Sequence, residues 1–269
     1  MTMMETALPK PAATLVLLRP DPDGFSVLLM KRPSRSSFMG GMHVFPGGKV
    51  EAGDWGGPMS ARDASVAERM GLAPEAAAAY VQAACRETFE EMGVLLGKAG
   101  LSADDVRGAR AAMAEEKLAW HQWAGAVPEP GWSPVYFDHW ITPEIEPKRF
   151  DTRFFATEIP AGAEPEPNSE AIAWGFYRPD KALELVERGE MSLAPPTLVT
   201  LIRLAKHATS GEALRELGAR RVGPLQPALA GADPLTLALP GHPAHPVPER
   251  LGDNPHTIIM RDGRWEIIW

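Results

Sequence analysis

The sequence has almost no cysteine, because Cys85 is the single one among 269 residues. An internal disulfide framework needs at least two cysteines and a cysteine-rich zinc site needs more, so both are excluded. Basic residues are also in the minority, with 27 Lys and Arg against 35 Asp and Glu and a formal net charge of −8. Binding of nucleic acid by phosphate neutralisation needs a concentrated basic face, so we expect no nucleic acid as a partner.

Long apolar runs are missing as well. No uncharged apolar run approaches the roughly 20 residues of a membrane-spanning helix, and the N-terminus has no basic stretch followed by an apolar core. We therefore expect a cytoplasmic protein with no membrane partner. The sequence also lacks a phosphate-binding Gly-Lys-Ser loop, a dinucleotide-type glycine fingerprint and a Gly-x-Ser-x-Gly elbow, which argues against the enzyme classes that use them.

Short aliphatic runs separated by turn residues predict a sheet at the start of the chain. Ala13–Arg19 and Phe25–Lys31 flank the turn cluster Asp21–Gly24, which indicates a β-hairpin. Met42–Phe45 is a further short strand, and the glycines after Pro46 stop it. Three more strands are expected later in the chain, at Val135–Ile141, Thr152–Ile159 and Ala171–Tyr177.

The clearest predicted helix is Pro74–Leu96, which has a proline near its start and Gly93 and Gly97 near its end. A polar, alanine-rich stretch from about Ala52 to Glu75 indicates one or two short helices before it. Four further helices are expected, at Ala103–Trp123, Asp180–Arg188, Pro196–Ala208 and Glu212–Arg220. Strands before and after a strong helix predict an α/β or α+β fold with a mixed sheet.

The last part of the chain has a different composition. Gly223–Asn254 is rich in Pro, Gly and Ala, which is typical of an extended arm. Thr257–Met260 and Trp265–Trp269 flank an Asp-Gly turn, which predicts a terminal hairpin. We expect the arm to pack back on the domain or on a second subunit, which would make a homodimer. The chain is thus divided into a main domain, residues 8–210, and a C-terminal extension, residues 211–269.

One helical segment has the residues for chemistry. At 100° per residue, Glu87, Glu90 and Glu91 fall within one arc about 100° wide. The other side of this helix is apolar and comprises Val81, Cys85, Phe89 and Met92. Three carboxylates on one face repel one another unless a hard divalent cation such as Mg²⁺ or Mn²⁺ lies among them. The alternative is a solvated acidic helix face.

Two other segments suit a phosphate-containing ligand. Val44–Glu51 ends a strand in a glycine-rich turn, where the backbone can approach a phosphate or a metal closely. Lys31, Arg32 and Arg35 form a local basic cluster on an acidic protein, suited to a 3′-phosphate or a diphosphate. A solvated strand end is the alternative for this cluster.

Trp140, Phe150, Phe154 and Phe155 either stack on an adenine or pack in the core.

The glycine turn and the carboxylate helix together resemble the signature of the Nudix hydrolase superfamily. That signature is Gly, five residues, Glu, seven residues, then Arg-Glu-aliphatic-any-Glu-Glu-any-Gly-aliphatic. Gly48 and Asp54 match its first half, with Asp in place of Glu, and the second half is matched by Arg86, Glu87, Glu90, Glu91, Gly93 and Val94. Between Asp54 and Arg86 lie 31 residues where the pattern has seven.

An interrupted signature is similar to that of the coenzyme A diphosphatase-like subgroup. Three further blocks fit this subgroup, namely His139–Pro143, Arg149–Phe155 and Leu193–Thr197. The resemblance implies a Nudix-type α/β/α sandwich with a mixed sheet, enlarged by a helical insertion at about residues 55–78. It also implies hydrolysis of a small-molecule nucleoside diphosphate, with coenzyme A or an acyl-coenzyme A as the favoured substrate and Mg²⁺ or Mn²⁺ as cofactor.

The resemblance assigns roles to individual residues. Glu90, Glu91 and the Gly47 carbonyl are expected metal ligands, while Glu87 is either a ligand or the base that takes the proton of water. Arg86 is expected to pair with Glu90. Asp54 is expected to support the loop, and Gly48 to contact the substrate together with the basic cluster. A distant loop is expected to supply one more carboxylate, and its candidates are Glu170 and, as alternatives, Glu166 and Glu164.

Two rival functions remain at this point. The same site in an enzyme could cleave ADP-ribose, a dinucleotide or a damaged nucleotide, because the signature fixes the reaction and leaves the rest of the substrate open. Alternatively, the chain could be a non-catalytic Nudix-fold module that binds nucleotides. Modules of that kind usually lose carboxylates, whereas Glu87, Glu90 and Glu91 are all present here, so catalysis is favoured.

Overall fold

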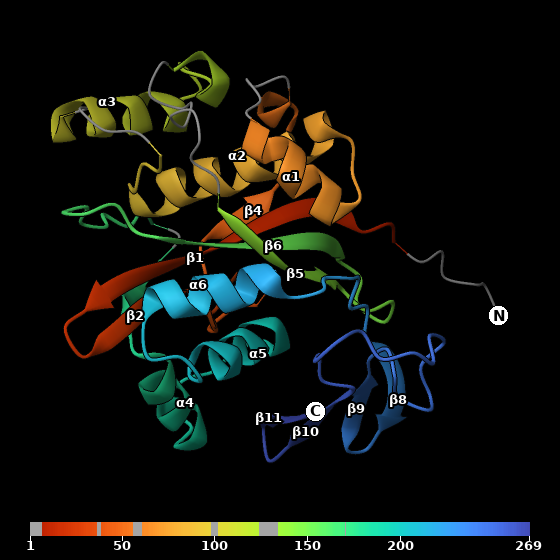
Figure 1. The fold of residues 1–269 in the computed structure, drawn as a ribbon. Coiled ribbons are helices and arrows are strands. Elements are labelled where there is room, and N and C mark those ends of the chain that lie inside the picture. Colours follow the sequence, from red (N-terminus) through yellow and green to blue (C-terminus); the bar gives the residue numbers. More distant parts are fainter. Residues whose placement is uncertain (1–6, 37–38, 56–60, 98–101, 124–133, 170) are drawn as a thin grey trace.

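The computed structural model describes residues 7–36, 39–55, 61–97, 102–123, 134–169 and 171–269. A seven-stranded mixed sheet lies between two layers of helices, with α1, α2 and α3 on one face and α4, α5 and α6 on the other (Figure 1). A separate four-stranded sheet, formed by the end of the chain, lies beside the second layer. The α/β/α architecture with a mixed sheet agrees with the predicted fold class.

The main sheet is built around its first strand, β1. Its strands are β1 (Lys10–Asp21), β2 (Gly24–Lys31), β3 (His43–Val44), β4 (Gly47–Lys49), β5 (Val135–Ile141), β6 (Phe150–Glu158) and β7 (Ala173–Tyr177). The order is β3-β2-β1-β6-β5, with β4 paired to β1 and β7 paired to β2. β1 and β2 form the predicted hairpin, in which Asp21 lies opposite Gly24, whereas β1 and β6 are parallel.

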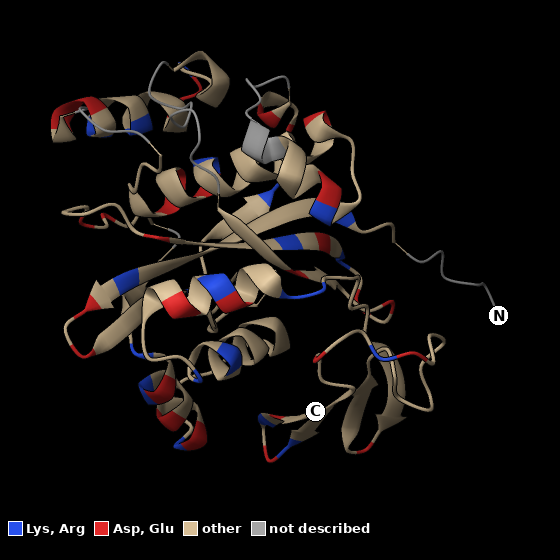
Figure 2. Ribbon diagram, in the orientation of Figure 1, with Lys and Arg blue, Asp and Glu red and all other residues tan. Residues whose placement is uncertain are grey.

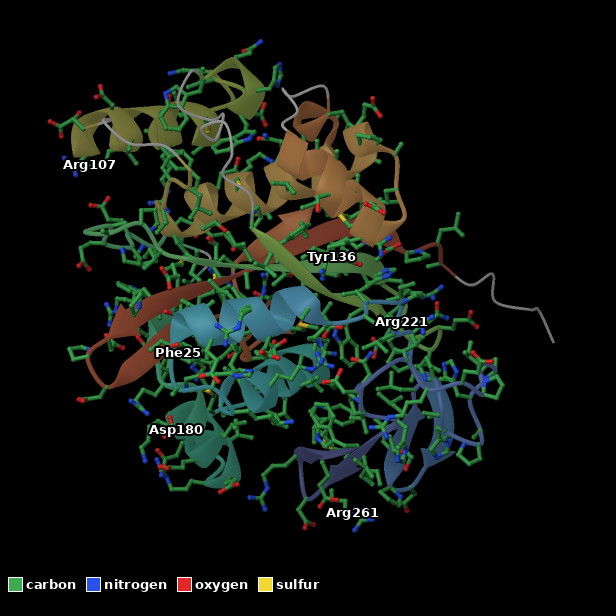
Figure 3. All side chains as sticks on the ribbon, viewed as in Figure 1. Phe25, Arg107, Tyr136, Asp180, Arg221 and Arg261 are labelled. Carbon is green, nitrogen blue, oxygen red and sulfur yellow. The ribbon has the colours of Figure 1, made fainter. Side chains whose placement is uncertain are left out.

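The central strand is apolar on both sides because both faces of the sheet are covered. Leu15, Val16, Leu17 and Leu18 are all fully buried. Successive side chains of a strand point to opposite faces, so Leu15 and Leu17 enter the core beneath α2 while Val16 and Leu18 enter the core beneath the second helical layer. Side chains fill the space between the sheet and both layers (Figure 3).

The first helical layer contains the carboxylate helix. It comprises the helices α1 (Ala61–Met70), α2 (Pro74–Met92) and α3 (Ala103–Ala114), with the short 3₁₀ turns η1 (Ala52–Asp54) and η2 (Trp120–Gln122). Helix α2 begins with Pro74 in its first turn and ends where Gly93 adopts a left-handed conformation, with φ of 68°. Phe89 and Met92 on its apolar side are fully buried against the sheet.

The helix predicted at Ala103–Trp123 is shorter in the structure and ends at Ala114. Glu116 has a positive φ of 57°, and the amides of Lys117 and Leu118 both donate to the Ala112 carbonyl, which closes the helix. The remaining predicted helices are present with shifted ends, as α4 (Pro179–Glu187), α5 (Pro195–Leu204) and α6 (Ser210–Ala219). The glycine segment expected as a turn contains the short strand β4.

The end of the chain forms the second sheet, which is called here the C-terminal sheet. Its strands are β8 (Ala228–Ala232), β9 (Leu235–Ala238), β10 (Thr257–Arg261) and β11 (Arg264–Ile268), in the order β11-β10-β9-β8. The predicted hairpin of β10 and β11 is confirmed, and Asp262 and Gly263 both have positive φ in its turn. The expectation of an extended arm was wrong for β8 and β9. Their alanine and glycine content gives little strand signal, yet β9 pairs with β10 of the hairpin and β8 pairs with β9.

Buried polar contacts fix the C-terminal sheet to the main domain. Arg203 on α5 donates to both Asp138 on β5 and Asn254, the residue shortly before β10. Arg220, after α6, donates to the same Asn254 side chain at 2.9 Å and forms an ion pair with Asp253. The C-terminal sheet is therefore held in a defined position. Our division of the chain after residue 210 stays a prediction.

Charged residues lie mainly on the outer helices and loops, while the strands of the main sheet are mostly uncharged (Figure 2). No helix among the residues described is long and apolar enough to cross a bilayer. Cys85 is buried in the core beneath α2, as expected for the apolar side of that helix.

Candidate active site

The glycine segment lies in tight contact with the strand beside it. Gly47 and Gly48 of β4 pair with Thr14 and Ala13 of β1. A Cβ atom on Gly47 would lie 2.4 Å from the Ala13 carbonyl oxygen and 2.8 Å from the Thr14 Cα atom. Both are backbone atoms that cannot move aside, so only glycine fits at this position.

The next glycine accommodates a carboxylate of α2. A Cβ atom on Gly48 would lie 2.3 Å from Oε1 and 2.4 Å from Cδ of Glu87. The Glu87 carboxylate thus lies directly against the backbone of the segment. One helical turn further, Oε2 of Glu91 accepts a hydrogen bond of 3.0 Å from the Gly47 amide. Two of the three carboxylates predicted to share a face are therefore in contact with the glycine backbone.

Arg86 connects the carboxylates to one another. Its guanidinium donates to Asp54 at 2.9 and 3.0 Å, to Glu87 at 3.0 Å, to Glu90 at 3.1 Å and to the Lys49 carbonyl at 2.9 Å. Burial by itself would lower the pKa of Arg86, but the hydrogen bonds to Asp54 and the negative charges around it raise the pKa above its ordinary value. Arg86 is therefore a permanent cation, and the expected pairing with Glu90 is present.

Asp54 joins the two halves of the interrupted signature. It is 1% exposed, and beside Arg86 it accepts a hydrogen bond of 2.7 Å from the Glu51 amide. The segment between Asp54 and Arg86 forms α1 and most of α2 and then returns to the same point. The contacts are those expected of a residue that supports the loop, and that role stays a prediction.

Glu90 has a different environment from its neighbours. Burial raises the pKa of Glu90, and the positive charge of Arg86 offsets part of this rise. The Glu90 backbone carbonyl accepts hydrogen bonds from Arg110 at 2.8 Å and from the Asn168 side chain at 3.0 Å. The loop before β7 thus covers the end of α2, where the last carbonyls of a helix need partners.

That loop was expected to supply a distant carboxylate. Glu170 lies outside the described residues. Glu166 is exposed, its amide donates to the Met92 carbonyl, and its carboxylate is 3.6 Å from Arg107 on α3. Glu164 is exposed as well, and neither Glu164 nor Glu166 lines the pocket described below. The distant ligand therefore stays a prediction without structural support.

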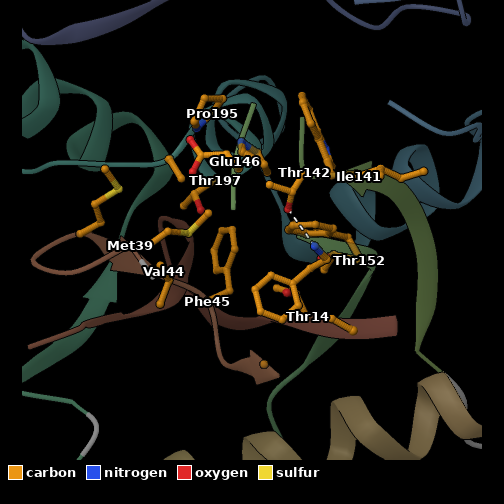
Figure 4. Close-up of a pocket in the computed structure, with 18 of the residues that line it drawn as sticks. Thr14, Met39, Val44, Phe45, Ile141, Thr142, Glu146, Thr152, Pro195 and Thr197 are labelled. Carbon is orange, nitrogen blue, oxygen red and sulfur yellow. Dashed lines mark hydrogen bonds between the residues drawn. The ribbon is translucent and has the colours of Figure 1, made fainter. Parts of the chain in front are cut away.

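A pocket of about 670 Å³ extends from the carboxylates along the main sheet, on the face that is covered by α4, α5 and α6. Gly47, Gly48, Glu87 and Glu91 line it, whereas Glu90 does not. In Figure 4 the labelled lining residues extend from Met39 and Val44 on one side, past Phe45, to Ile141 and Thr152 on the other. Ligand pockets for small molecules have volumes of this order, from about 300 to 1,000 Å³.

The basic cluster is only partly directed to this pocket. Arg32 lines it and also lines an adjoining hollow of about 360 Å³, which Arg35 shares. Lys31 lines neither of the two. Lys49 and Lys148, which we did not single out from the sequence, line the large pocket instead.

Sequence reasoning also missed the loop between β5 and β6. Ile145, Glu146 and Lys148 of this loop line the pocket. Arg149 holds the loop by donating to the Thr142 carbonyl at 2.9 Å. The two sequence blocks that resemble the coenzyme A diphosphatase-like subgroup, one ending at Pro143 and the next beginning at Arg149, flank this loop. Their positions could have indicated that the loop lies at the site. This loop thus adds Glu146 to the acidic residues of the pocket, whereas Glu164 and Glu166 do not line it.

Four aromatic residues were expected either to stack on an adenine or to pack in the core, and the structure places some of them in the pocket and one in the core. Trp140, Phe150 and Phe154 line the pocket, whereas Phe155 is fully buried in the core beneath α2. Nε1 of Trp140 donates to Asp138 at 2.9 Å, which fixes the indole ring in the pocket wall.

The carboxylates of α2 and the carbonyl groups of the glycine segment offer oxygen atoms that could bind a hard divalent cation. Carboxylate and carbonyl oxygens are the ligands that Mg²⁺ and Mn²⁺ prefer. Within the described ranges, no three His, Cys, Asp or Glu side chains converge as a metal site. Glu87 and Glu91 border the pocket next to the Gly47 backbone, whereas Glu90 does not border it. Of the residues expected to supply ligands, Glu87, Glu91 and Gly47 thus line the pocket.

Comparison with known proteins gives relatives in sequence and in structure. No model of a known protein family matches the chain. The acyl-coenzyme A diphosphatase NUDT19 of Gallus gallus is 27% identical over 296 residues, which cover 88% of this chain and 77% of that protein. The acyl-coenzyme A diphosphatase NUDT19 of Xenopus laevis is 26% identical over 289 residues, covering 87% and 75%. A Nudix hydrolase structure from Alicyclobacillus acidocaldarius has a TM-score of 0.57 and 24% identity, and covers 78% of this chain and 97% of that chain.

Proposed function

We propose that this chain, which has the Nudix fold and resembles Nudix hydrolases in sequence, is a metal-dependent diphosphatase of coenzyme A and acyl-coenzyme A. The products would be 3′,5′-ADP and 4′-phosphopantetheine or its acyl thioester. The observation that supports this proposal most is the position of Glu87 and Glu91. Both border one pocket of suitable size, directly against the backbone of Gly47 and Gly48.

In the proposed mechanism the protein holds the diphosphate between the glycine backbone and α2. Glu87, Glu91 and the Gly47 carbonyl would hold the divalent cation, with Glu90 as a further candidate. When bound, Mg²⁺ or Mn²⁺ supplies Lewis acidity to the diphosphate and makes a water molecule more acidic. Glu87 either belongs to this ligand set or takes the proton of the attacking water, and both roles need its carboxylate in the space that Gly48 leaves open.

Arg86 acts through the carboxylates in this mechanism. It binds Glu87 and Glu90 at 3.0 and 3.1 Å and is itself held by Asp54, so it fixes the position of both glutamates. It does not line the pocket, which makes it a positioning residue. Because its positive charge is permanent, it also reduces the mutual repulsion of the carboxylates.

Basic side chains in and beside the pocket would bind the phosphates. Arg32 lies between the large pocket and the adjoining hollow, where Arg35 is its neighbour. A guanidinium pair of this kind suits the 3′-phosphate of coenzyme A, because arginine binds phosphate oxygens in a bidentate manner. Lys49 lines the pocket close in sequence to the two glycines and is suited to the diphosphate.

A panel of diphosphates tests the proposal. Purified protein with Mg²⁺ or Mn²⁺ is offered coenzyme A, an acyl-coenzyme A, ADP-ribose and a dinucleotide polyphosphate, and the products are separated by chromatography. We expect turnover of coenzyme A or its acyl thioester, and loss of that turnover when a chelator removes the metal. Turnover of ADP-ribose alone would contradict the assignment of coenzyme A as substrate and would identify ADP-ribose as the substrate instead. Binding of the panel without any turnover would favour a nucleotide-binding module instead.

A cytoplasmic location and a homodimer stay predictions. The second is checked by light scattering of the purified protein, and the first by fractionation of cells that express the chain.

A further inference from the structure

The C-terminal sheet has one apolar face. Leu237, Ile258 and Ile267 lie opposite one another across β9, β10 and β11, and Met260 lies opposite Trp265 two residues away. Residues paired across antiparallel strands point to the same side, and so do residues two apart on one strand. These five side chains therefore share a face. Glu266 and Ile268 of β11 lie on the other face.

Part of this apolar face is a wall of the pocket that contains the carboxylates. Leu235, Leu237 and Trp265 of the C-terminal sheet line the same pocket as Glu87 and Glu91. Pro227, just before β8, adds to this apolar wall. The pocket is thus lined by acidic and backbone polar groups where it meets α2, and by uncharged side chains where it meets the C-terminal sheet.

A second observation points to an apolar ligand at this wall. Ile145, on the loop between β5 and β6, lines the same pocket and is 52% exposed. Trp265 and Leu235 are only partly buried, although the C-terminal sheet packs on the core below. Large apolar side chains that remain accessible around one cavity are typical of a binding site for apolar groups.

We propose that the wall formed by Leu235, Leu237 and Trp265 binds the acyl chain of an acyl-coenzyme A, so that the C-terminal sheet determines chain-length specificity. This inference rests on the proposed diphosphatase function. The diphosphate would lie at Glu87 and Glu91, and the thioester with its acyl chain would extend toward the C-terminal sheet. The adenosine phosphates would extend in the other direction, toward Arg32.

The anchoring of the C-terminal sheet supports this role. The hydrogen bonds from Arg203 and Arg220 to Asn254 hold the segment before β10 against the main domain. A wall that is already in position binds without an ordering penalty, so burial of each methylene group contributes directly to affinity. The specificity constant kcat/KM for longer saturated chains should therefore exceed that for short ones, by about tenfold or more.

The first experiment measures kcat/KM of the wild-type protein for free coenzyme A and for saturated acyl-coenzyme A thioesters of increasing length. We expect the ratio of acyl to free substrate to rise with chain length. A flat series, with coenzyme A itself turned over, would overturn the inference and leave the diphosphatase function intact. Absence of turnover with every member of the series would instead refute the function on which the inference rests.

The second experiment localises the effect to the C-terminal sheet. Trp265→Ala and Leu235→Ser are each expected to lower one ratio by about tenfold, that of kcat/KM for the longest acyl-coenzyme A to kcat/KM for free coenzyme A. Ile268→Ala is the matched control, because Ile268 is on the same strand as Trp265 but is directed to the other face and does not line the pocket. Thermal unfolding shows which variants fold. An unchanged ratio in either folded pocket variant, or an equal fall in Ile268→Ala, would overturn the assignment of the wall.

Discussion

The Arg86 guanidinium donates hydrogen bonds of 2.9 and 3.0 Å to the two carboxylate oxygens of Asp54, a residue 32 positions earlier in the chain. Arg86 is 6% exposed and Asp54 is 1% exposed, so the pair is removed from water. The same guanidinium binds Glu87 and Glu90. The position of the carboxylates therefore depends on a buried ion pair between residues that are separated by 31 others.

Replacing Asp54 by Asn should destabilise the protein strongly. The change leaves the buried Arg86 charge with fewer negative partners, and breaking a buried pair typically costs about 3–5 kcal/mol. Urea unfolding followed by circular dichroism gives the free energy of unfolding. Asp104→Asn is the control, because its pair with Arg107 is solvent-exposed and should contribute less than about 1 kcal/mol. Equal losses in both variants would contradict a special role for the buried pair.

Gly48→Ala should lower the turnover number by about tenfold to a hundredfold while the protein stays folded. The added methyl group would occupy the space of the Glu87 carboxylate, 2.3 Å from Oε1, so this flexible side chain must move away. Steady-state kinetics and thermal unfolding are measured together. Gly108→Ala on α3 is the control, since a Cβ atom there meets nothing within 4 Å and the substitution favours the helix. Turnover of Gly48→Ala at the wild-type rate would show that the Glu87 position is unimportant.

Glu91→Gln should reduce turnover by at least about a hundredfold, because the substitution removes the negative charge with which the carboxylate would hold a divalent cation. The amide oxygen can still accept the hydrogen bond from the Gly47 amide, so the fold should persist. The rate is measured over a range of Mn²⁺ concentrations. Glu184→Gln on α4, which is exposed and pairs with Lys181, should leave the rate unchanged. A folded Glu91→Gln protein with near-normal turnover would exclude Glu91 from the metal site.

Asp151 should make stability depend on pH in the acidic range. Burial raises the pKa of Asp151, but the hydrogen bond with His139 at 2.6 Å and the positive charge of Arg153 together lower the pKa below its ordinary value of 3.8. The folded state therefore holds the proton less tightly than the unfolded state does. The stabilisation is complete above the unfolded value and is lost as the pH falls through the lower, folded pKa.

The test compares the wild-type protein with Asp151→Asn at a near-neutral pH and at about pH 3. The difference in the free energy of unfolding between the two proteins should be largest near neutrality and should shrink at the acidic pH. A constant difference would mean that the carboxylate charge does not contribute.

Local signals in the sequence were sufficient for much of the fold. The turn between β1 and β2 was predicted because Asp, Pro and Gly separate two short apolar runs, and Asp21 does lie opposite Gly24. Helix α2 was predicted to continue to Leu96, but it ends at Met92 because Gly93 adopts the left-handed conformation, which glycine does readily. In both cases the residues that determine the structure are neighbours in the chain.

Contacts between distant segments could not be predicted in this way. β1 and β6 pair in parallel, and each contributes apolar side chains to the cores on both faces of the sheet. No residue in either strand indicates which other strand will be its neighbour. β8 and β9 were missed because their composition gives little strand signal, while their pairing, of β9 with β10 and of β8 with β9, joins separate segments of the chain.

The candidate site shows the same division. Helical spacing placed Glu87, Glu90 and Glu91 on one face, and the structure brings Glu87 and Glu91 to the pocket. Spacing could not show that the Gly47 amide binds Glu91, because that contact joins segments 44 residues apart. Nor could it show that Trp265, near the end of the chain, lines the same pocket.

The contact between Asp54 and Arg86 can also be considered as the closure of a polymer loop of 31 residues. The entropy of joining two chain ends grows only with the logarithm of the number of residues between them. Lengthening the interval from the seven residues of the family pattern to 31 adds only about 1.3 kcal/mol on this scale. That is less than the cost of about 3–5 kcal/mol that is typical for breaking a buried ion pair, such as the one at the point of closure. The site should therefore tolerate wide variation in the length of this segment, provided that Asp54 and Arg86 can still meet.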